Sequence, residues 1–179
     1  MTLSYSAPRR SVRDVVTLLL WRYVGALLFR LTPMPLFVVR SGILRVFGAK
    51  VGRACKIYPT VKIWHPMNLE LGSFCGVGEG VYLYNQAAII VGEGAVLSRN
   101  CFVCTATHDY NSVGFDLIRS KVIIAPQAWL ASNCTILPGL HVGEGAVIGA
   151  CAVLTKDALP WGVYAGNPAR WMKQRTQQA

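Results

Sequence analysis

The chain has 179 residues, and 53% of them are hydrophobic, which is enough for one domain with a sizeable core and an appendage. Its 18 basic and 8 acidic residues give a formal net charge of +10, which favours an anionic partner such as a membrane surface or a phosphorylated ligand. The sequence has no aromatic–basic RNA-binding motif and no helix-turn-helix pattern, so we do not expect it to bind nucleic acid.

Residues 1–50 differ from the rest of the chain and are predicted to form a helical N-terminal cap. The longest uncharged apolar runs are Val15–Trp21 and Tyr23–Phe29, each far shorter than the roughly 20 residues of a membrane-spanning helix. A break at Thr32–Pro35 separates this first helix from a second one, expected around Leu36–Phe47.

Two roles for this segment stay open, and they are compatible. One is to cover the open end of the domain that follows, as repeat proteins require. The other is to lie on an anionic membrane as an interfacial helix, because Arg13, Arg22 and Arg30 stand among Trp and Tyr residues.

An aliphatic residue recurs every six positions from Val51 onward, with a small residue four places after most of them. Gly directly follows the aliphatic residue at several of these positions. The aliphatic positions are Val51, Ile57, Ile63, Leu71, Val77, Leu83, Val91, Leu97, Val103, Ile124, Leu130, Ile136, Val142, Ile148 and Leu154.

A period of six fits neither a helix nor an ordinary strand, and it is typical of a solenoid with a triangular coil. Each hexad supplies one short strand and one turn, with the aliphatic residue inside, the small residue near the corner and Gly permitting a tight turn. Eighteen residues make one coil, so residues 51–160 are predicted to form a mainly β domain, a parallel β-helix of about five coils.

The repeat is interrupted in two ways. It slips by two residues at Leu69-Glu70 and at Ile89-Ile90, which indicates a longer corner in the early coils. It stops after His108, and a polar loop over residues 109–121 intervenes; a loop of this length outside a regular solenoid usually has a function. Residues 161–179 leave the period, and we expect a short basic C-terminal helix to begin near Ala169.

The six cysteines are expected to serve packing. Four of them occupy small-residue positions of the hexad, where buried free cysteine is common. A single CxxC, Cys101 to Cys104, has no second pair, so it favours neither zinc nor redox chemistry. Reduced cysteines fit the cytoplasm.

Several motifs resemble those of the hexapeptide-repeat acyltransferases, and the resemblance covers nearly the whole chain. Within that family the chain resembles the colanic-acid-type exopolysaccharide O-acetyltransferases, and galactoside and maltose acetyltransferases are better-known relatives. The motifs are the hexads, the loop after THD, QAWLASN at residues 127–133, VIGACAVLTKD at 147–157, AGNPAR at 165–170, YNQ at 84–86, CTATHDY at 104–110 and the run from Leu28 to Gly52.

The resemblance implies a left-handed β-helix that assembles as a homotrimer, with an active site in each cleft between neighbouring subunits. It also implies acetyl-CoA as the donor substrate, a sugar or lipid-linked sugar hydroxyl as the acceptor, and no metal. The apolar, basic N-terminus favours an acceptor at the membrane, so we expect a cytoplasmic protein that can associate peripherally with the inner face of the cell membrane.

The catalytic histidine of the family corresponds to His108. An alcohol is a weak nucleophile at neutral pH, so its attack on a thioester needs a base that takes its proton, and an imidazole suits this task. The acceptor-binding asparagine of the family corresponds to Asn85, although a corner residue is the alternative role. Asp109 is a weaker candidate to orient the imidazole or contact the acceptor, because adjacent strand residues point in opposite directions.

The donor site is expected along the later coils. By resemblance, Trp129 lies beside the pantetheine arm, and Ser132, Ala150 and Thr155 line the same groove, partly through backbone groups. Lys156 and Arg170 are candidates to contact the phosphates of CoA, although each alone is more often a solvated surface charge.

Three classes of function compete. The leading one is an acetyl-CoA-dependent O-acetyltransferase for an exopolysaccharide or a lipid-linked oligosaccharide precursor. The second is an acetyltransferase for a small soluble acceptor such as an amino sugar, serine or an antibiotic. The third, a γ-type carbonic anhydrase or a scaffold, is disfavoured because the three histidines, His65, His108 and His141, are expected too far apart along the prism to share a zinc ion, and the usual close histidine pair is missing.

Overall fold

The computed structural model describes residues 11–176. Four helical elements come first: α1 (Val12–Leu20), the π-helical turn η1 (Trp21–Gly25), α2 (Ala26–Leu31) and α3 (Phe37–Val46). Ser11 caps α1, because its hydroxyl accepts a hydrogen bond of 3.1 Å from the backbone N–H of Asp14. None of the helices within 11–176 is long and apolar enough to cross a membrane.

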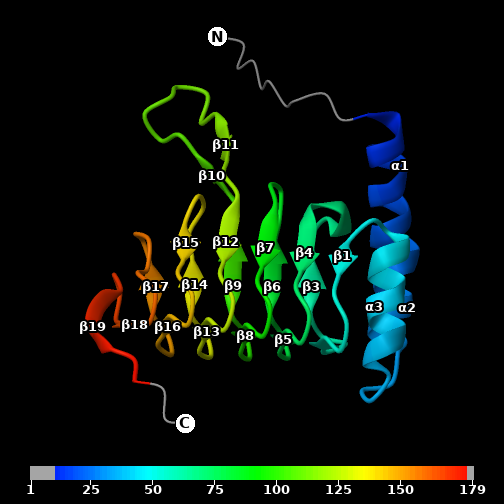
Figure 1. The fold of residues 1–179 in the computed structure, drawn as a ribbon. Coiled ribbons are helices and arrows are strands. Elements are labelled where there is room, and N and C mark those ends of the chain that lie inside the picture. The colour runs from blue at the N-terminus through cyan, green and yellow to red at the C-terminus, as the bar shows by residue number, and fades with distance from the viewer. Residues whose placement is uncertain (1–10, 177–179) are drawn as a thin grey trace.

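Most of the strands form three parallel sheets, here called faces A, B and C, and the chain passes through the three in turn, which makes a triangular prism of stacked coils (Figure 1). Face A contains β1 (Lys50–Val51), β4 (Leu69–Leu71), β7 (Ile89–Val91), β12 (Val122–Ile124) and β15 (His141–Val142). Face B contains β2 (Lys56–Ile57), β5 (Gly76–Val77), β8 (Val96–Leu97), β13 (Trp129–Leu130), β16 (Val147–Ile148), β18 (Gly162–Ala165) and β19 (Arg170–Gln174). Face C contains β3 (Lys62–Ile63), β6 (Tyr82–Tyr84), β9 (Phe102–Cys104), β14 (Thr135–Ile136) and β17 (Val153–Leu154).

The register confirms the predicted parallel β-helix. Aliphatic residues of successive coils are direct neighbours, for example Val77 beside Leu97 on face B, and these side chains are buried. The chain forms about six turns rather than five, because β18 pairs with β16 and Ala158 forms a bridge with Val142. The sixth turn lies beyond the last aliphatic hexad, so the periodicity alone did not reveal it.

Glycine has a different role in the hexad from the one expected. The residue with a positive φ in such a turn comes two positions after the predicted glycine position, and it is, for example, Ala54 or Asn100. The glycine itself lies where stacked coils approach each other: a Cβ on Gly92 would be 2.4 Å from the backbone nitrogen of Pro126. Close stacking therefore accounts for this glycine.

The C-terminal helix prediction was wrong for the described residues. After the cis peptide bond between Asn167 and Pro168, residues 170–174 form β19, which runs antiparallel to β18 at the end of face B. All the side chains of β19 are exposed. The segment forms a strand because its backbone pairs with groups at the edge of β18 that would otherwise have no partner.

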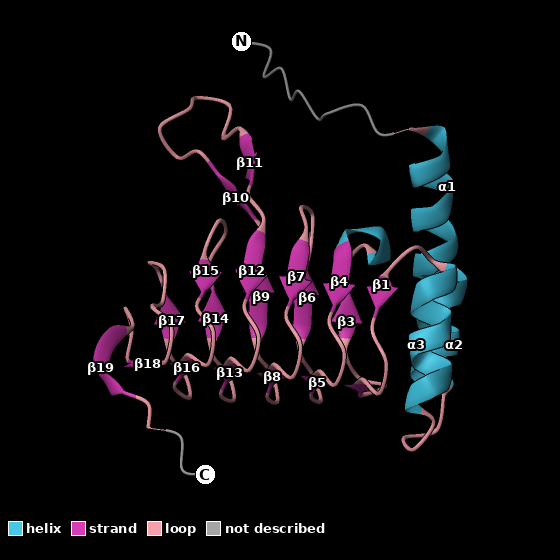
Figure 2. Ribbon diagram, in the orientation of Figure 1, coloured by secondary structure: helices cyan, strands magenta, loops and turns pink. Residues whose placement is uncertain are grey.

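The N-terminal helices cover the first coil, at the end of the prism opposite to β19 (Figure 2). Trp21 is the main contact: its indole N–H donates to the carbonyl oxygen of Ile63 at 2.9 Å, and its ring packs edge-on against Phe29 and Phe47. The capping role is therefore present in the structure.

The corner between faces C and A, here called the hairpin edge, carries the longest turns. Its turns span residues 65–68, including the short 3₁₀ helix η2 (Pro66–Asn68), then 85–88, 105–121, 137–140 and 155–157. In the third turn, β10 (Ala106–His108) and β11 (Leu117–Arg119) pair antiparallel and project from the prism (Figure 1). The predicted extruded loop is thus a hairpin that leaves the prism at this edge.

Candidate active site

His108 lies at the end of β10, on the exposed hairpin. Its Nδ1 is 2.5 Å from the carbonyl oxygen of Phe115. Since a carbonyl can only accept, Nδ1 must carry the hydrogen, and the neutral ring then keeps a lone pair on Nε2. The hairpin therefore fixes both the orientation of the imidazole and the tautomer that a general base needs.

The tip of the hairpin is held by its own hydrogen bonds. The backbone N–H of Asp109 donates to the carbonyl of Asp116 at 2.9 Å, and the hydroxyl of Ser112 donates to the Asp116 carboxylate at 2.6 Å. The Asp109 carboxylate accepts from the backbone N–H of Asn111 at 2.9 Å. Within residues 11–176, no hydrogen bond joins this carboxylate to the ring of His108, so the Phe115 carbonyl is the group that orients it.

Asn85 lies on the same edge, one coil before His108, but its side chain is fully buried. Its amide oxygen accepts from the backbone N–H of His65 at 2.9 Å, and its amide nitrogen donates to the carbonyl of His65 at 2.6 Å. In this conformation the Asn85 side chain joins two coils at the corner. Its contact with an acceptor stays a prediction.

A polar chain that the sequence analysis did not predict connects the hairpin to face C. Arg119 of β11 donates to the side-chain oxygen of Gln86 at 3.2 Å, and the amide nitrogen of Gln86 donates to the hydroxyl of Tyr84 at 2.5 Å. Only the position of Gln86 beside Asn85 pointed to this edge. Nothing in the sequence pointed to Arg119, because its position beside Gln86 depends on how β10 and β11 pair across the hairpin.

Two predicted donor residues share a groove near the C-terminal end. Lys156 and Arg170 line a hollow of about 350 Å³, together with Asp157, Tyr164 and Trp171. The hollow brings two cations together from residues far apart in sequence. Thr155 precedes Lys156 in the last turn of the hairpin edge.

The other predicted donor residues lie elsewhere on the prism. Ser132 and Ala150 occupy equivalent positions of successive coils at the corner between faces B and C, where the carbonyl of Ser132 accepts from the N–H of Cys151 at 3.0 Å. Trp129 is 45% exposed on face B, and its indole N–H donates to the Ser98 hydroxyl at 2.9 Å. Face B is opposite to the hairpin edge, so Trp129 and His108 lie on different sides of one subunit.

The four cysteines on the hexad are buried, as the packing interpretation predicts, whereas Cys151 is exposed. Cys101 and Cys134 are buried with their sulfur atoms 3.6 Å apart and are not bonded to each other. Cys104 is also buried, and burial raises the pKa of its thiol. Among residues 11–176 there is no group of three His, Cys, Asp or Glu side chains placed to hold a metal ion.

Comparison with known sequences shows extensive similarity to acetyltransferases. Residues 121–156 match the family described as bacterial transferase hexapeptide (six repeats). The chain is 35% identical over 164 residues, 92% of this chain and 90% of the relative, to the protein of Escherichia coli strain K12 named "Putative colanic acid biosynthesis acetyltransferase WcaF". It is 33% identical to a chloramphenicol acetyltransferase of Agrobacterium fabrum over 60% of this chain and 52% of that protein.

Solved structures share the fold. A maltose O-acetyltransferase from Clostridium difficile 630 is 25% identical, with a TM-score of 0.83 over 93% of this chain and 90% of that one. The hexapeptide-repeat acetyltransferase VCA0836 from Vibrio cholerae, in complex with acetyl coenzyme A, has a TM-score of 0.85 over 93% of this chain and 91% of that one. At 18% identity, this second likeness concerns the fold alone.

Proposed function

Because this chain belongs to the hexapeptide-repeat acyltransferase family, we propose that it transfers the acetyl group of acetyl-CoA to a sugar hydroxyl of an exopolysaccharide or its lipid-linked precursor. The name of the E. coli relative supports the acceptor class, and the ligand of the Vibrio structure supports the donor. The observation that carries the proposal is the exposed His108, with Nδ1 against the Phe115 carbonyl.

In the proposed reaction, Nε2 of His108 takes the proton of the acceptor hydroxyl as its oxygen attacks the thioester carbonyl. The C–S bond then breaks, and the CoA thiolate leaves. The imidazolium returns the proton to the sulfur, so the products are the O-acetyl sugar and CoA. The Phe115 carbonyl stabilises the charged ring, since it faces the N–H that remains on Nδ1.

A homotrimer is part of the proposal because the candidate residues are divided between opposite sides of one subunit. Trp129 is on face B, whereas His108 and Lys156 are at the hairpin edge. If the hairpin edge of one copy faces another side of its neighbour, a single acetyl-CoA can contact both sets. A cleft between subunits thus explains the division.

Peripheral membrane association fits the N-terminal helices. Their outward side carries large exposed side chains, including Tyr23 at 76% and Leu27 at 55% exposure. Asp14 is the only acidic residue between positions 11 and 49, while basic residues are frequent there. An apolar helix face with flanking cations is typical of segments that lie on an anionic bilayer.

The test is acetyl-CoA turnover, followed by release of the CoA thiol, with free sugars, sugar phosphates, lipid-linked sugars and chloramphenicol as acceptors. Mass spectrometry of the acceptor would show the gain of one acetyl group. Turnover with a sugar hydroxyl supports the proposal. Turnover with chloramphenicol alone would contradict the acceptor class, and no turnover with any acceptor would contradict the reaction.

A further inference from the structure

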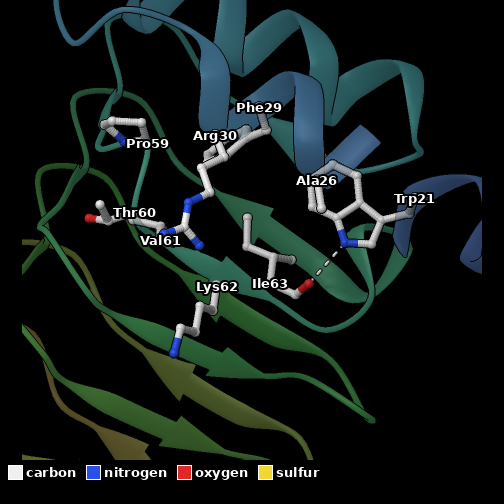
Figure 3. A pocket seen from close by; sticks show the side chains of 9 residues that line it. All are labelled: Trp21, Ala26, Phe29, Arg30, Pro59, Thr60, Val61, Lys62 and Ile63. Carbon is white, nitrogen blue, oxygen red and sulfur yellow. Dashed lines mark hydrogen bonds between the residues drawn. The ribbon is translucent and has the colours of Figure 1, made fainter. Parts of the chain in front are cut away.

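The junction between the N-terminal helices and the first coil contains two neighbouring hollows. One, of about 180 Å³, is lined by residues of η1, α2 and β3 and the turn before β3 (Figure 3). The other, of about 230 Å³, shares Trp21, Ala26, Lys62 and Ile63 with the first. Neither hollow belongs to the donor or hairpin residues described above.

Three cations line these hollows: Arg30 and Lys62 at the first, and Arg22 and Lys62 at the second. In Figure 3 the Arg30 side chain extends from α2 over β3, towards Val61 and Ile63. No acidic residue lines either hollow, and both ion pairs within residues 11–176, Lys50–Glu70 and Arg99–Glu79, lie elsewhere. The hollows therefore concentrate positive charge that no carboxylate in the described chain neutralises.

Other arginines of this cap are used by the fold itself. Arg40 is buried and donates to the carbonyls of Ile57, Thr32, Pro33 and Met34. Arg45 donates to the carbonyls of Val51 and Gly52. Arg22, in contrast, lies over the ring of Trp64, 5.0 Å from its centroid, and it leaves its N–H groups directed at no protein acceptor in the described chain.

An aromatic path leads from the hollows towards the catalytic hairpin. Trp64 contacts Tyr84 with ring centroids 5.2 Å apart, and Tyr82 contacts both Tyr84 and Phe102 on face C. Tyr84 is joined to the hairpin through Gln86. Aromatic rings offer flat apolar surfaces with polar edges, which suit the faces of sugar rings.

The helices that line the hollows also carry exposed apolar side chains. Tyr23 follows Arg22 directly, and Leu27 follows Ala26, and both point outward. A ligand at this junction can thus place a hydrocarbon chain along the helices, a phosphate among the cations and a sugar on the aromatic rings. Clustered arginine and lysine side chains are typical binding groups for a phosphate.

We propose that Arg22, Arg30 and Lys62 form a phosphate subsite that binds the phosphate of a phosphate-linked acceptor sugar. The assignment rests on the proposed function for the sugar, but the subsite itself is independent of the reaction. The phosphate bound there can belong to a membrane lipid that carries the sugar or to a soluble sugar phosphate. The experiment below distinguishes these two ligands.

The test compares the variant R22Q/R30Q/K62Q with the matched control K50Q/R53Q/K56Q. Both remove three positive charges from the first coil and its cap, but Lys50 lies on face A, Lys56 on face B and Arg53 in the turn between them. One arm measures sedimentation with phosphatidylcholine vesicles that contain or lack phosphatidylglycerol. The other arm measures binding of glucose 1-phosphate and inorganic pyrophosphate by calorimetry.

We expect the subsite variant to lose about a hundredfold in binding, since each cation near an anionic lipid surface contributes about fivefold. The control should keep most of its binding. Loss in the vesicle arm identifies a lipid phosphate, and loss in the calorimetric arm alone identifies a soluble one. Equal loss in variant and control, or no binding of any probe by the unmodified protein, would overturn the subsite.

A second readout separates this inference from the proposed function. With a free sugar acceptor, the subsite variant should turn over as the unmodified protein does, whereas with a phosphate-linked acceptor its KM should rise without a change in kcat. If the unmodified protein binds phosphate but transfers no acetyl group, the proposed function fails and the subsite stands. If it transfers acetyl groups and the variant is unaffected with every acceptor, the subsite fails alone.

Discussion

The Nδ1 atom of His108 and the carbonyl oxygen of Phe115 are 2.5 Å apart, across the two sides of the projecting hairpin. The contact ties the tautomer of the imidazole to the conformation of the loop, in which Phe115 has a left-handed backbone with a φ of 47°. The interruption of the repeat thus supplies the partner that orients the ring of His108, which a regular hexad turn does not contain.

Replacing His108 with Ala should lower kcat by about 10²- to 10⁴-fold, the usual contribution of a general base. The side chain is exposed, so the fold and the affinity for CoA should not change. His141→Ala is the matched control, because His141 is another exposed histidine, on face A. Equal turnover in the two variants would contradict the role of His108.

Replacing Lys156 and Arg170 with Gln should raise the KM for acetyl-CoA. Both side chains line one hollow, and an exposed ion pair contributes up to about 1 kcal/mol. The KM of the double variant should therefore rise by up to ~30-fold. The difference should shrink as salt rises, because salt screens exposed charges. An unchanged KM at low salt would place the CoA phosphates elsewhere, and the pair Lys50→Gln and Arg53→Gln controls for net charge.

The prism could be predicted because each hexad obeys one local rule. A buried Val, Ile or Leu every six residues is compatible with few other folds, and even the two-residue slips appear as longer turns on a single edge. The C-terminal strand β19 could not be predicted in this way. Its side chains are exposed along its whole length, and it forms because β18 offers an unpaired edge.

The site was predicted unevenly for a related reason. His108 could be found because it directly precedes an interruption of the repeat. Arg119 and Gln86 could not, since their contact depends on the hairpin register and on which coil lies beside it. Asn85 was identified by its motif, but the sequence did not show that its amide oxygen and its amide nitrogen both form hydrogen bonds with the backbone of His65.

Arg40 should be essential for stability. Its guanidinium is fully buried and donates to four carbonyls, three of them in the break between α2 and α3. Arg40→Leu would leave the carbonyls of Ile57, Thr32 and Met34 without this donor, whereas the Pro33 carbonyl keeps its hydrogen bond from the backbone N–H of Leu36. Each lost donor costs about 1–3 kcal/mol, so the free energy of unfolding, measured in urea at a fixed protein concentration, should fall by at least ~3 kcal/mol. Arg40→Lys should recover only part of this, because an ammonium does not reproduce the planar fork. A variant with Leu as stable as the unmodified protein would contradict the structural role.

The outward side of the helices should bind lipid. Tyr23→Ser with Leu27→Ser should reduce binding to anionic vesicles by at least tenfold, because burying each side chain in the interface contributes about 1.5 kcal/mol or more. Stability in solution should stay the same, since both side chains already face water. Leu159→Ser with Met172→Ser is the control, because these exposed residues lie at the far end of the prism. Equal vesicle binding by the two double variants would contradict membrane association through the helices.

Cys151 offers a test of the donor site that does not depend on turnover. It is the only exposed cysteine of the six, and it follows Ala150, a predicted donor residue. We expect one thiol to react rapidly with Ellman's reagent in the native protein and all six after denaturation, because buried thiols are shielded from the reagent. Cys151→Ala should abolish the rapid phase. If Ala150 and Ser132 line the donor groove, desulfo-CoA, which carries no thiol, should slow the reaction of Cys151 at least fivefold, and the effect should follow its binding curve. A rate that does not change at saturating ligand would place the donor away from the corner between faces B and C.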